Sequence, residues 1–497
     1  MSRNLFLVLN EACQGSLDKT FLSLPANQSL TYADFFKLAE SYALALKSCG
    51  VTEGDRVLVK TKKSSDALAL YLGCLQLGAV YIPVNPRSTQ HEIDYFVNDA
   101  DPAIVIFDPN EDISVGIRSE TIGDGGTLTL MAASAAQEVL NASSSTSDIA
   151  AMLYTSGTTG RPKGALLSHR ALISNGIALN SIWAFKTDDV LLHCLPVFHV
   201  HGLFVAIHCA MLSGSTVIFR EKFSVTEVTQ LLQKSTVFMG VPTYYTRLLS
   251  SNSFNSTVCS GMRLFTSGSA PMTEQTHKSF YERTGHQIVE RYGMTEAGII
   301  ASNPLEGKRI PGSVGFRLPG MDLRIAIDGR ACGTGENGVV EVKGDHLFSG
   351  YWRKPEQTAE AFQKDGFLIT GDIGNLDDDG RLRLEGRSTD LIISGGENVY
   401  PKEIEICLDD FDTVLEAAVI GVPHPDLGEA VVAVLVADGS LSIQELKDYV
   451  VKRLTSLKQP KEYFVISELP RNTMGKVQKS KLRASYSALF TKGIEGN

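Results

Sequence analysis

The stretch YTSGTTGRPKG, residues 154–164, lies between a strand-like segment and a helical pattern. A strand, a loop and a helix in this order form the repeating unit of α/β folds, so the stretch predicts that class. Its glycines let backbone N–H groups approach phosphate oxygens closely, and its hydroxyls and the cations Arg161 and Lys163 add charge-assisted hydrogen bonds. The composition favours a phosphate site, with a flexible surface loop as the alternative.

The loop is not the P-loop that many ATPases carry. Gly164 follows Lys163, so the pattern GxxxxGK[ST] is not met and the hydroxyl that holds Mg²⁺ in that motif has no counterpart here. A different way of holding a nucleotide is therefore expected.

Strand and helix patterns alternate on the N-terminal side of the loop. Thr31 and Asp34 form the pattern of a helix cap, and the helix is expected to stop at Gly50. Residues 56–60 and 103–107 are typical of strands, and residues 65–79 of a helix. This alternation predicts a parallel, doubly wound sheet, and a second α/β stretch follows the loop.

The pattern changes near residue 310 to short strands with glycine turns, which predicts a small β-barrel or sandwich. Beyond residue 386 the pattern is compact α+β. A chain of 497 residues exceeds one core. We expect a large N-terminal domain, 1–388, of two doubly wound α/β sheets plus a small β-barrel, and a small α+β C-terminal domain, 389–497, joined to it by a hinge.

Composition excludes several classes of protein. The net charge is −10, and an acidic chain without a long basic block is a poor nucleic-acid binder. The eight cysteines form no CxxC pair, which favours a reducing compartment, and we expect a cytoplasmic protein. No apolar run approaches the roughly 18 residues that a membrane span needs.

Five further segments carry a resemblance. They are SGSAP (267–271), ERYGMTE (290–296), TGD (370–372), GRSTDLIISGGENVYPKEIE (386–405) and PRNTMGKVQK (470–479). In this order, and together with the loop, they resemble the adenylate-forming superfamily of acyl-CoA synthetases, luciferases and peptide-synthetase adenylation domains. The resemblance covers essentially the whole chain. It implies an AMP-forming acyl-CoA synthetase that uses ATP, Mg²⁺ and coenzyme A.

The resemblance also implies roles for residues. Lys476, Glu296 and Thr155 are the expected catalytic residues, with Glu296 on Mg²⁺ and Lys476 on the α-phosphate. Asp372 is expected to take the ribose hydroxyls. The expected ATP site comprises Thr155, Ser156, Gly157, Thr158, Thr159, Gly160, Lys163, Gly268, Ser269, Ala270, Glu290, Arg291, Tyr292, Gly293, Met294, Thr295, Asp372, Arg387 and Lys476.

In the superfamily the small domain rotates between two half-reactions. The resemblance places the hinge at Asp390 and the CoA tunnel near Gly395 and Gly396. Adenylation is then expected with Lys476 in the site, and thioester formation after rotation.

The acid is the harder question. Arg291 would shorten the acyl pocket and offer a partner for a second carboxylate, with a surface salt bridge to Glu290 as the alternative. The pocket for the substrate is expected to comprise His199, His201, Met239, Ser269 and Arg291. Together with VFHVHGLF and MGVPTYYTRLL these features resemble malonyl-CoA synthetases, which activate malonate and often methylmalonate.

Three alternatives stay open. The chain would activate oxalate or another short acid, would load a carrier protein instead of CoA, or would bind a nucleotide without chemistry. A monomer and a homodimer are equally compatible with the sequence.

Overall fold

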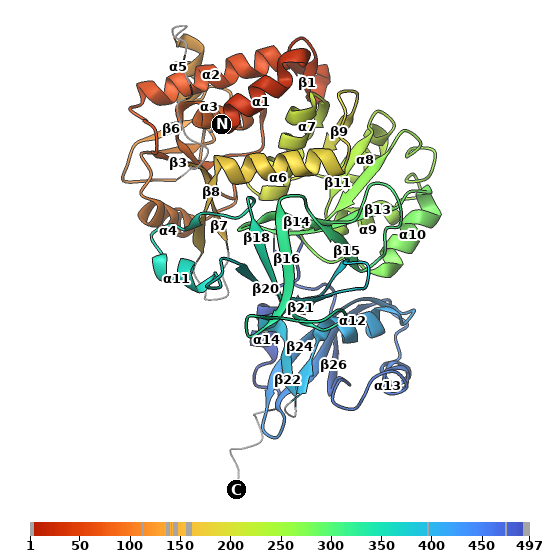
Figure 1. Ribbon diagram of the computed structural model, residues 1–497. Helices are drawn as coiled ribbons and strands as arrows, with labels where there is room; N and C mark the ends of the chain where they lie inside the picture. The colour runs from red at the N-terminus through yellow and green to blue at the C-terminus, as the bar shows by residue number, and fades with distance from the viewer. Residues whose placement is uncertain are drawn as a thin grey trace.

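The computed structural model describes residues 4–111, 113–135, 140, 142, 148–155, 162–394, 397–472 and 475–490. A large N-terminal body lies above a small C-terminal body, and the two meet at a narrow junction (Figure 1). Within the described residues, the α/β class and the division into a large and a small part are confirmed.

The first sheet of the large part has a parallel centre. Strands β3, β4, β5, β6 and β7 pair in parallel, whereas β8 and β19 add an antiparallel edge. In spatial order its strands are β19 (Gly350–Tyr351), β8 (Lys163–Ser168), β7 (Ile149–Thr155), β4 (Val80–Pro83), β3 (Arg56–Lys60), β5 (Ile104–Phe107) and β6 (Ser119–Thr121).

The second sheet is longer and changes character along its length. Its centre, from β1 to β13, is parallel, and it becomes antiparallel from β13 onward. In spatial order its strands are β17 (Arg330–Ala331), β16 (Met321–Ile327), β18 (Gly338–Gly344), β20 (Leu368–Leu376), β21 (Leu382–Arg387), β15 (Ser313–Arg317), β14 (Gly298–Ser302), β13 (Ile288–Met294), β12 (Leu264–Ser267), β11 (Val237–Gly240), β9 (Val190–His193), β10 (Thr216–Phe219), β1 (Thr20–Ser23) and β2 (Ser29–Thr31). The strands expected as a separate barrel therefore continue this sheet through β14.

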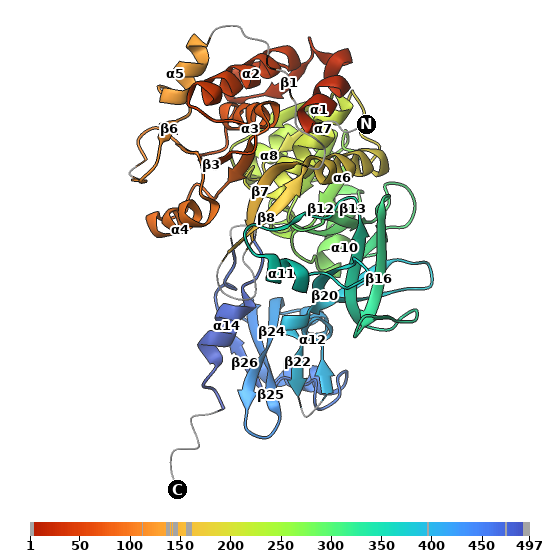
Figure 2. The same cartoon turned by 60° about the vertical axis from the view of Figure 1, so that its left-hand side comes forward.

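Helices cover both sheets, and α6 runs between them (Figures 1 and 2). The expected cap is present, because the Thr31 hydroxyl accepts from the Asp34 amide and the Asp34 carboxylate accepts from the Thr31 amide. The helices of the large part are α1 (Leu5–Cys13), α2 (Tyr32–Ser48), α3 (Ser65–Leu77), α4 (Gln90–Ala100), α5 (Thr127–Ser134), α6 (His169–Ile182), a π-helix (His201–Ile207), α7 (His208–Ser213), α8 (Val225–Leu232), α9 (Pro242–Leu249), α10 (Glu274–Thr284) and α11 (Pro355–Glu360).

One expectation about the opening stretch was wrong. The residues after Lys163 were expected to begin a helix, but β8 pairs antiparallel with β7, Thr155 opposite Lys163, and α6 starts only at His169. Helix propensity is a weak prior, and burial of this segment between β7 and β19 overrides it. The stretch therefore joins two strands of a hairpin.

The small part follows a short 3₁₀ turn, Ser388–Asp390. Its sheet carries α12, α13 and α14, as the α+β pattern predicts, and lies below the large part in both cartoon views (Figures 1 and 2). Its elements are β22 (Ile392–Ser394), β23 (Glu397–Val399), α12 (Pro401–Asp409), β24 (Val414–His424), β25 (Gly428–Ala437), α13 (Ile443–Val451), β26 (Glu462–Val465) and α14 (Lys479–Tyr486).

An acid in the small part is poorly solvated. Burial raises the pKa of the Asp409 carboxyl to about 7, and the carboxylates of Glu405 and Glu416 act in the same direction, while Lys402 and the Ala417 amide oppose them. Asp409 Oδ1 has no hydrogen-bond partner among the described residues. Below a pH of about 7 the Asp409 carboxyl is therefore mostly protonated in the folded protein, since its pKa is about 7.

The substitution Asp409→Asn is expected to stabilise the protein more at pH 8 than at pH 5, by about 2 kcal/mol. As pH rises from 3.8 to about 7, the unfolded chain ionises at this site and the folded chain does not, so the native protein loses stability across this window. Thermal unfolding of both proteins at pH 4, 5 and 8 measures the effect. A gain of equal size at all three pH values would contradict it.

Candidate functional site

The carboxylate expected to contact ribose lies among polar partners. Asp372 on β20 accepts a 2.5 Å hydrogen bond from the Tyr292 hydroxyl at Oδ2, and its Oδ1 lies 2.9 Å from Arg387 Nε. Asp372 and Arg387 are register partners on β20 and β21. Burial and the Asp372 carboxylate raise the pKa of Tyr292 well above its usual value. Three residues expected in the nucleotide site are thus brought together by one sheet.

The loop lysine and the expected metal carboxylate share a tyrosine. Tyr351 on β19 donates a 2.9 Å hydrogen bond to Glu296 Oε1, and Lys163 Nζ lies 5.2 Å from the centre of the Tyr351 ring. Burial, followed by the Glu296 carboxylate, raises the pKa of Tyr351. Sequence reasoning missed Tyr351, although the aromatic pair after Gly350 was a signal. Thr155, half-buried at the end of β7, completes this end of the site.

The donor set here fits a metal that arrives with a nucleotide. Within the described ranges, no group of three or more His, Cys, Asp and Glu side chains is placed to hold a metal ion by itself. Mg²⁺ in nucleotide sites usually takes one or two protein carboxylates together with phosphate oxygens and water. Glu296, 6% exposed and held by Tyr351, is suited to that role.

Lys476 reaches the same region from the small part. Burial lowers the pKa of Lys476, and the Arg387 charge adds to this, whereas Asp372 and Asp390 oppose it. Next to it, a Cβ at Gly475 would lie 3.0 Å from the Thr243 hydroxyl on α9. The segment that carries the lysine therefore contacts the large part, with Lys476 close to the Asp372 and Arg387 pair.

Arg291 carries a buried guanidinium. The residue is 5% exposed, and its Nε and Nη2 have no hydrogen-bond partner among the described residues. A Cβ on Gly268 would lie 2.4 Å from Arg291 Cζ, so only glycine at 268 leaves room for this side chain. Burial lowers the pKa of Arg291 to about 10, which keeps it protonated at neutral pH. An unpaired buried cation destabilises the folded protein by several kcal/mol, so we expect an anionic group of a ligand to pair with this side chain.

The imidazole of His201 lies near this cation, and His199 lies near His201 in turn. His201 is 3% exposed, and neither of its ring nitrogens has a hydrogen-bond partner within the described part of the chain. Burial and the Arg291 charge hold the pKa of His201 well below its usual value. Burial lowers the pKa of His199 to about 4. Both rings are neutral at pH 7, so each offers one N–H donor while Arg291 supplies the charge.

A lysine outside the expected site supports the chain at His201. Lys63 Nζ donates to His193 Nδ1 at 2.6 Å, to the His193 carbonyl at 3.0 Å and to the Arg220 carbonyl at 2.6 Å. His193 Nε2 donates in turn to the Gly202 carbonyl at 2.8 Å. Burial lowers the pKa of Lys63 to about 7. These residues gave no sequence signal, because only tertiary contacts reveal their role.

The remaining residues expected in the site differ in their contacts and in their burial. The Glu290 carboxylate accepts from the Met272 amide at 3.3 Å and lies 3.0 Å from His277 Nε2, so it turns away from Arg291. The alternative of a surface salt bridge between Arg291 and Glu290 is therefore wrong. Met239 is buried on β11, and Ser269 is half-buried with a φ of 71°. The half-buried residues Ala270, Gly293, Met294 and Thr295 line the ends of β12 and β13.

Part of the expected site lies outside the described residues. These positions are Ser156, Gly157, Thr158, Thr159, Gly160, Gly395 and Gly396. Their expected roles in binding phosphate and CoA therefore stay predictions.

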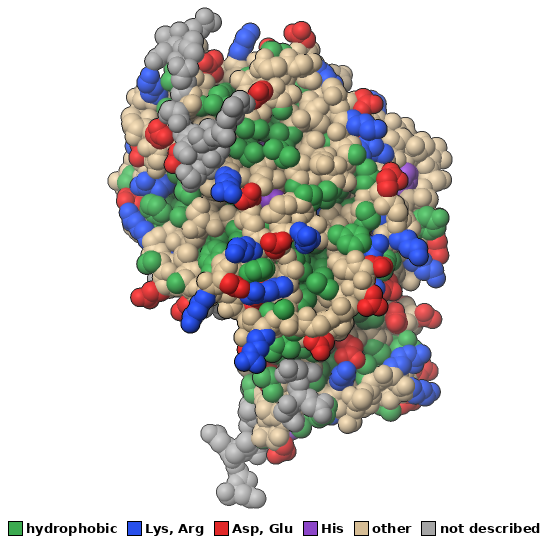
Figure 3. All heavy atoms as spheres, viewed as in Figure 1, with side chains coloured by type: hydrophobic (Ala, Val, Ile, Leu, Met, Phe, Trp, Pro, Cys, Tyr) green, Lys and Arg blue, Asp and Glu red, His purple; other side chains and the backbone are tan. Residues whose placement is uncertain are grey.

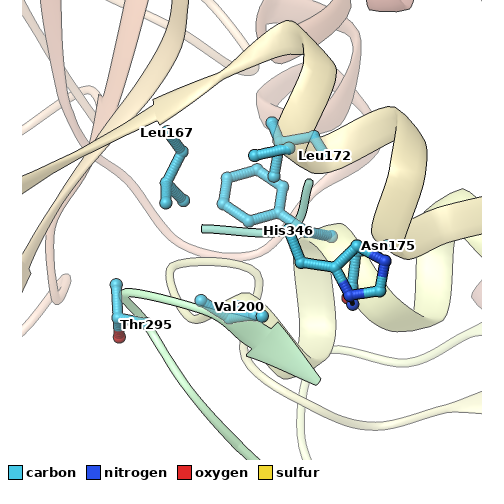
Figure 4. A pocket seen from close by; sticks show the side chains of 9 residues that line it. Leu167, Leu172, Asn175, Val200, Thr295 and His346 are labelled. Atoms are coloured by element: carbon cyan, nitrogen blue, oxygen red, sulfur yellow. Dashed lines mark hydrogen bonds between the residues drawn. The ribbon is translucent and has the colours of Figure 1, made fainter. Parts of the chain in front are cut away.

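A small, mainly apolar pocket adjoins the site (Figure 4). Asn175 and His346 lie side by side, Leu172 comes from the same helix as Asn175, and Leu167 comes from β8. The other lining residues are Ala171, Val200, Phe204, Thr295 and Gly298. Asn175 Nδ2 lies 3.1 Å from His346 Nδ1 and also donates to the Ile299 carbonyl. The pocket links the segment of His199 and His201 to the turn that carries Glu296.

Figure 3 shows how charged side chains are distributed over one face of the molecule. Acidic and basic side chains are intermixed there, without a large area of one sign. No helix in the described ranges is long and apolar enough to cross a bilayer.

The family described as AMP-binding enzyme matches residues 9–352, and the family described as AMP-binding enzyme C-terminal domain matches residues 403–476. A malonate–CoA ligase of Arabidopsis thaliana is 33% identical over 488 residues, which cover 88% of this chain and 79% of the relative. The long-chain-fatty-acid–CoA ligase FadD13 of Mycobacterium tuberculosis is 34% identical and covers 93% of this chain and 94% of its own.

Among solved structures, ATP-bound MatB from Rhodopseudomonas palustris is similar with a TM-score of 0.96 and 44% identity, over 99% of this chain and 100% of that chain. Apo MatB from the same organism has a TM-score of 0.86 over the same shares of the two chains.

Proposed function

Because the chain belongs to the AMP-binding enzyme family and is an AMP-forming acyl-CoA synthetase, we propose that the acid it activates is malonate. The overall reaction converts malonate, ATP and CoA into malonyl-CoA, AMP and pyrophosphate. Methylmalonate, which adds one methyl group, is a second expected substrate.

One observation carries this proposal: the buried Arg291 has guanidinium nitrogens without partners among the described residues. A dicarboxylate offers a second anionic group for this cation after the first carboxylate has reacted. A fatty acid would leave the charge buried and unpaired. Relatives named as malonate–CoA ligases support the proposal, whereas relatives named for long-chain fatty acids show that family membership alone does not select the acid.

In the first half-reaction a malonate carboxylate oxygen attacks the α-phosphorus of ATP, and pyrophosphate leaves. Lys476 stabilises the charge on the α-phosphate oxygens, and Lys163 with Thr155 holds the departing phosphates. Asp372 accepts hydrogen bonds from the ribose hydroxyls, for which Tyr292 and Arg387 orient it. Mg²⁺ at Glu296 would neutralise phosphate charge.

In the second half-reaction the CoA thiol attacks the acyl carbonyl, and AMP leaves. We place the domain boundary at 388, with rotation at Asp390 between the half-reactions and CoA near Gly395 and Gly396. The contact of Gly475 with Thr243 supports the adenylating arrangement for the present structure. The higher TM-score with the ATP-bound form of MatB than with its apo form agrees with this.

ATP–pyrophosphate exchange with malonate, methylmalonate, oxalate, acetate and octanoate tests the choice of acid. We expect exchange with malonate to exceed exchange with acetate and with octanoate by at least about 30-fold, because about 2 kcal/mol of charge pairing is at stake. Octanoate exchange equal to that of malonate would contradict the proposal. Stronger exchange with oxalate would reassign the acid on the same scaffold, and faster transfer to a carrier protein than to CoA would reassign the acceptor.

A further inference from the structure

We propose that two ion pairs, Arg471–Glu416 and Lys479–Glu405, are positioning elements that hold Lys476 in place for adenylation. Both pairs lie in the small part, outside the residues assigned to the site above. The inference rests on the proposed role of Lys476 at the α-phosphate.

Lys476 lies in a hairpin whose described residues, 470–472 and 475–479, pair with each other. Arg471 and Val477 form an antiparallel bridge. The Asn472 amide donates to the Lys476 carbonyl and the Lys476 amide donates to Asn472 Oδ1, each at 2.9 Å. Gly475 has a φ of 76°, which an L side chain rarely adopts. The backbone at Lys476 is therefore fixed relative to the base of the hairpin.

The first ion pair fixes the base to the sheet. One Arg471 nitrogen, Nη2, pairs with Glu416 on β24, and the other, Nη1, donates to the Gly475 carbonyl at 2.5 Å. A planar guanidinium bonded on two sides ties the residue before Lys476 to β24, an edge strand of the small part. Removing Glu416 would release the guanidinium that carries both bonds.

The second ion pair fixes the other end. Lys479 Nζ lies 2.6 Å from Glu405 Oε1 on α12, and the Val419 amide donates to the same oxygen at 2.9 Å. Glu405 is 8% exposed, so this pair is better shielded from water than an exposed pair. The hairpin is thus attached to β24 before Lys476 and to α12 after it.

The position of the hairpin matters because Lys476 must act across the junction of the two parts. Its neighbour Gly475 contacts Thr243 of α9, and Lys476 is close enough to Arg387 and Asp372 for their charges to act on it. A displacement of about 1 Å in a catalytic group costs on the order of 100-fold in rate. Two weak attachments that act together would prevent such a displacement.

The experiment uses the full-length variants Glu416→Ala and Glu405→Gln and their double variant. We expect pyrophosphate exchange to fall about 10-fold in each single variant and about 100-fold in the double variant. Thioester formation from supplied acyl-AMP and CoA should stay within about twofold of wild type, because that step does not use Lys476. The second half-reaction thereby reports that the small part is folded.

A matched control is Glu403→Gln, which removes the 2.7 Å ion pair between Glu403 and Lys458 on the same helix, away from the hairpin. It should leave both half-reactions unchanged. In a Lys476→Ala background, Glu416→Ala should cause no further loss of exchange, since the two act through one group.

The outcomes are separable. If both half-reactions fall together in Glu416→Ala, the ion pair serves folding and the inference is wrong. If Glu416→Ala and Glu405→Gln leave exchange intact while Lys476→Ala abolishes it, the inference fails and the role of Lys476 stands. If Lys476→Ala itself keeps normal exchange, the proposed role of Lys476 fails with it.

Discussion

The variant Lys476→Ala is expected to lose acyl-AMP formation by about 1000-fold and to keep thioester formation from supplied acyl-AMP. The charges of Arg387 and Asp372, the pair proposed at the ribose, both act on the Lys476 ammonium group. A preorganised cation at the α-phosphate stabilises charge that develops only in the adenylation transition state. The effect should therefore be confined to the half-reaction in which Lys476 faces the site.

Two assays on one preparation measure this split: pyrophosphate exchange with malonate, and single-turnover thioester formation from acyl-AMP and CoA. Lys481→Ala provides the control, because Lys481 is an exposed lysine on α14 that follows Lys476 closely in sequence. Equal loss of both half-reactions in Lys476→Ala would argue against two arrangements of the small domain.

The variant Arg291→Met is expected to lower kcat/KM for malonate roughly 30- to 1000-fold, which corresponds to about 2–4 kcal/mol of lost transition-state stabilisation. Methionine keeps much of the buried volume and removes the charge, so loss of packing contributes little. The neutral His201 and His199 cannot replace the charge at neutral pH, because burial holds their pKa values low. Steady-state kinetics with malonate and with acetate measure the effect.

Acetate is the informative comparison, because it has no second carboxylate to pair with Arg291. Its kcat/KM should be unchanged or raised in Arg291→Met. Arg247→Met is a matched control, since Arg247 is exposed on α9. An equal fall for acetate and malonate would make Arg291 a structural residue.

Local sequence signals were sufficient for much of the fold. The cap at Thr31 and Asp34 and the strand at 56–60 depend on neighbours within a few residues, and both are confirmed. The strand β8 was missed because its residues suit a helix when taken alone, and pairing with β7 decides their conformation. The sequence therefore predicted the elements that depend on neighbouring residues, and it did not predict those that depend on pairing with a distant segment.

The residues of the candidate site also fall into two groups, those that motifs identified and those that only tertiary contacts reveal. Motifs identified Asp372, Glu296 and Arg291, but Tyr351 meets Glu296 only because β19 pairs with β8. Lys63, in the loop after β3 of the first sheet, meets His193 at the end of β9 in the second sheet. The sequence left open whether Arg291 is a surface residue in a salt bridge or a buried cation. The structure encloses the side chain, so Arg291 is a buried cation.

Neighbouring residues on β13 point to opposite faces of the sheet, so Arg291 and Tyr292 contact different parts of the protein. The Arg291 guanidinium lies against Gly268, whereas the Tyr292 hydroxyl donates a hydrogen bond to Asp372. The proposed function therefore assigns the support of the ribose contact and the selection of the acid to two adjacent residues of one strand. We therefore expect a substitution at position 291 to change which acid is activated while the hydrogen bond between Tyr292 and Asp372 stays intact.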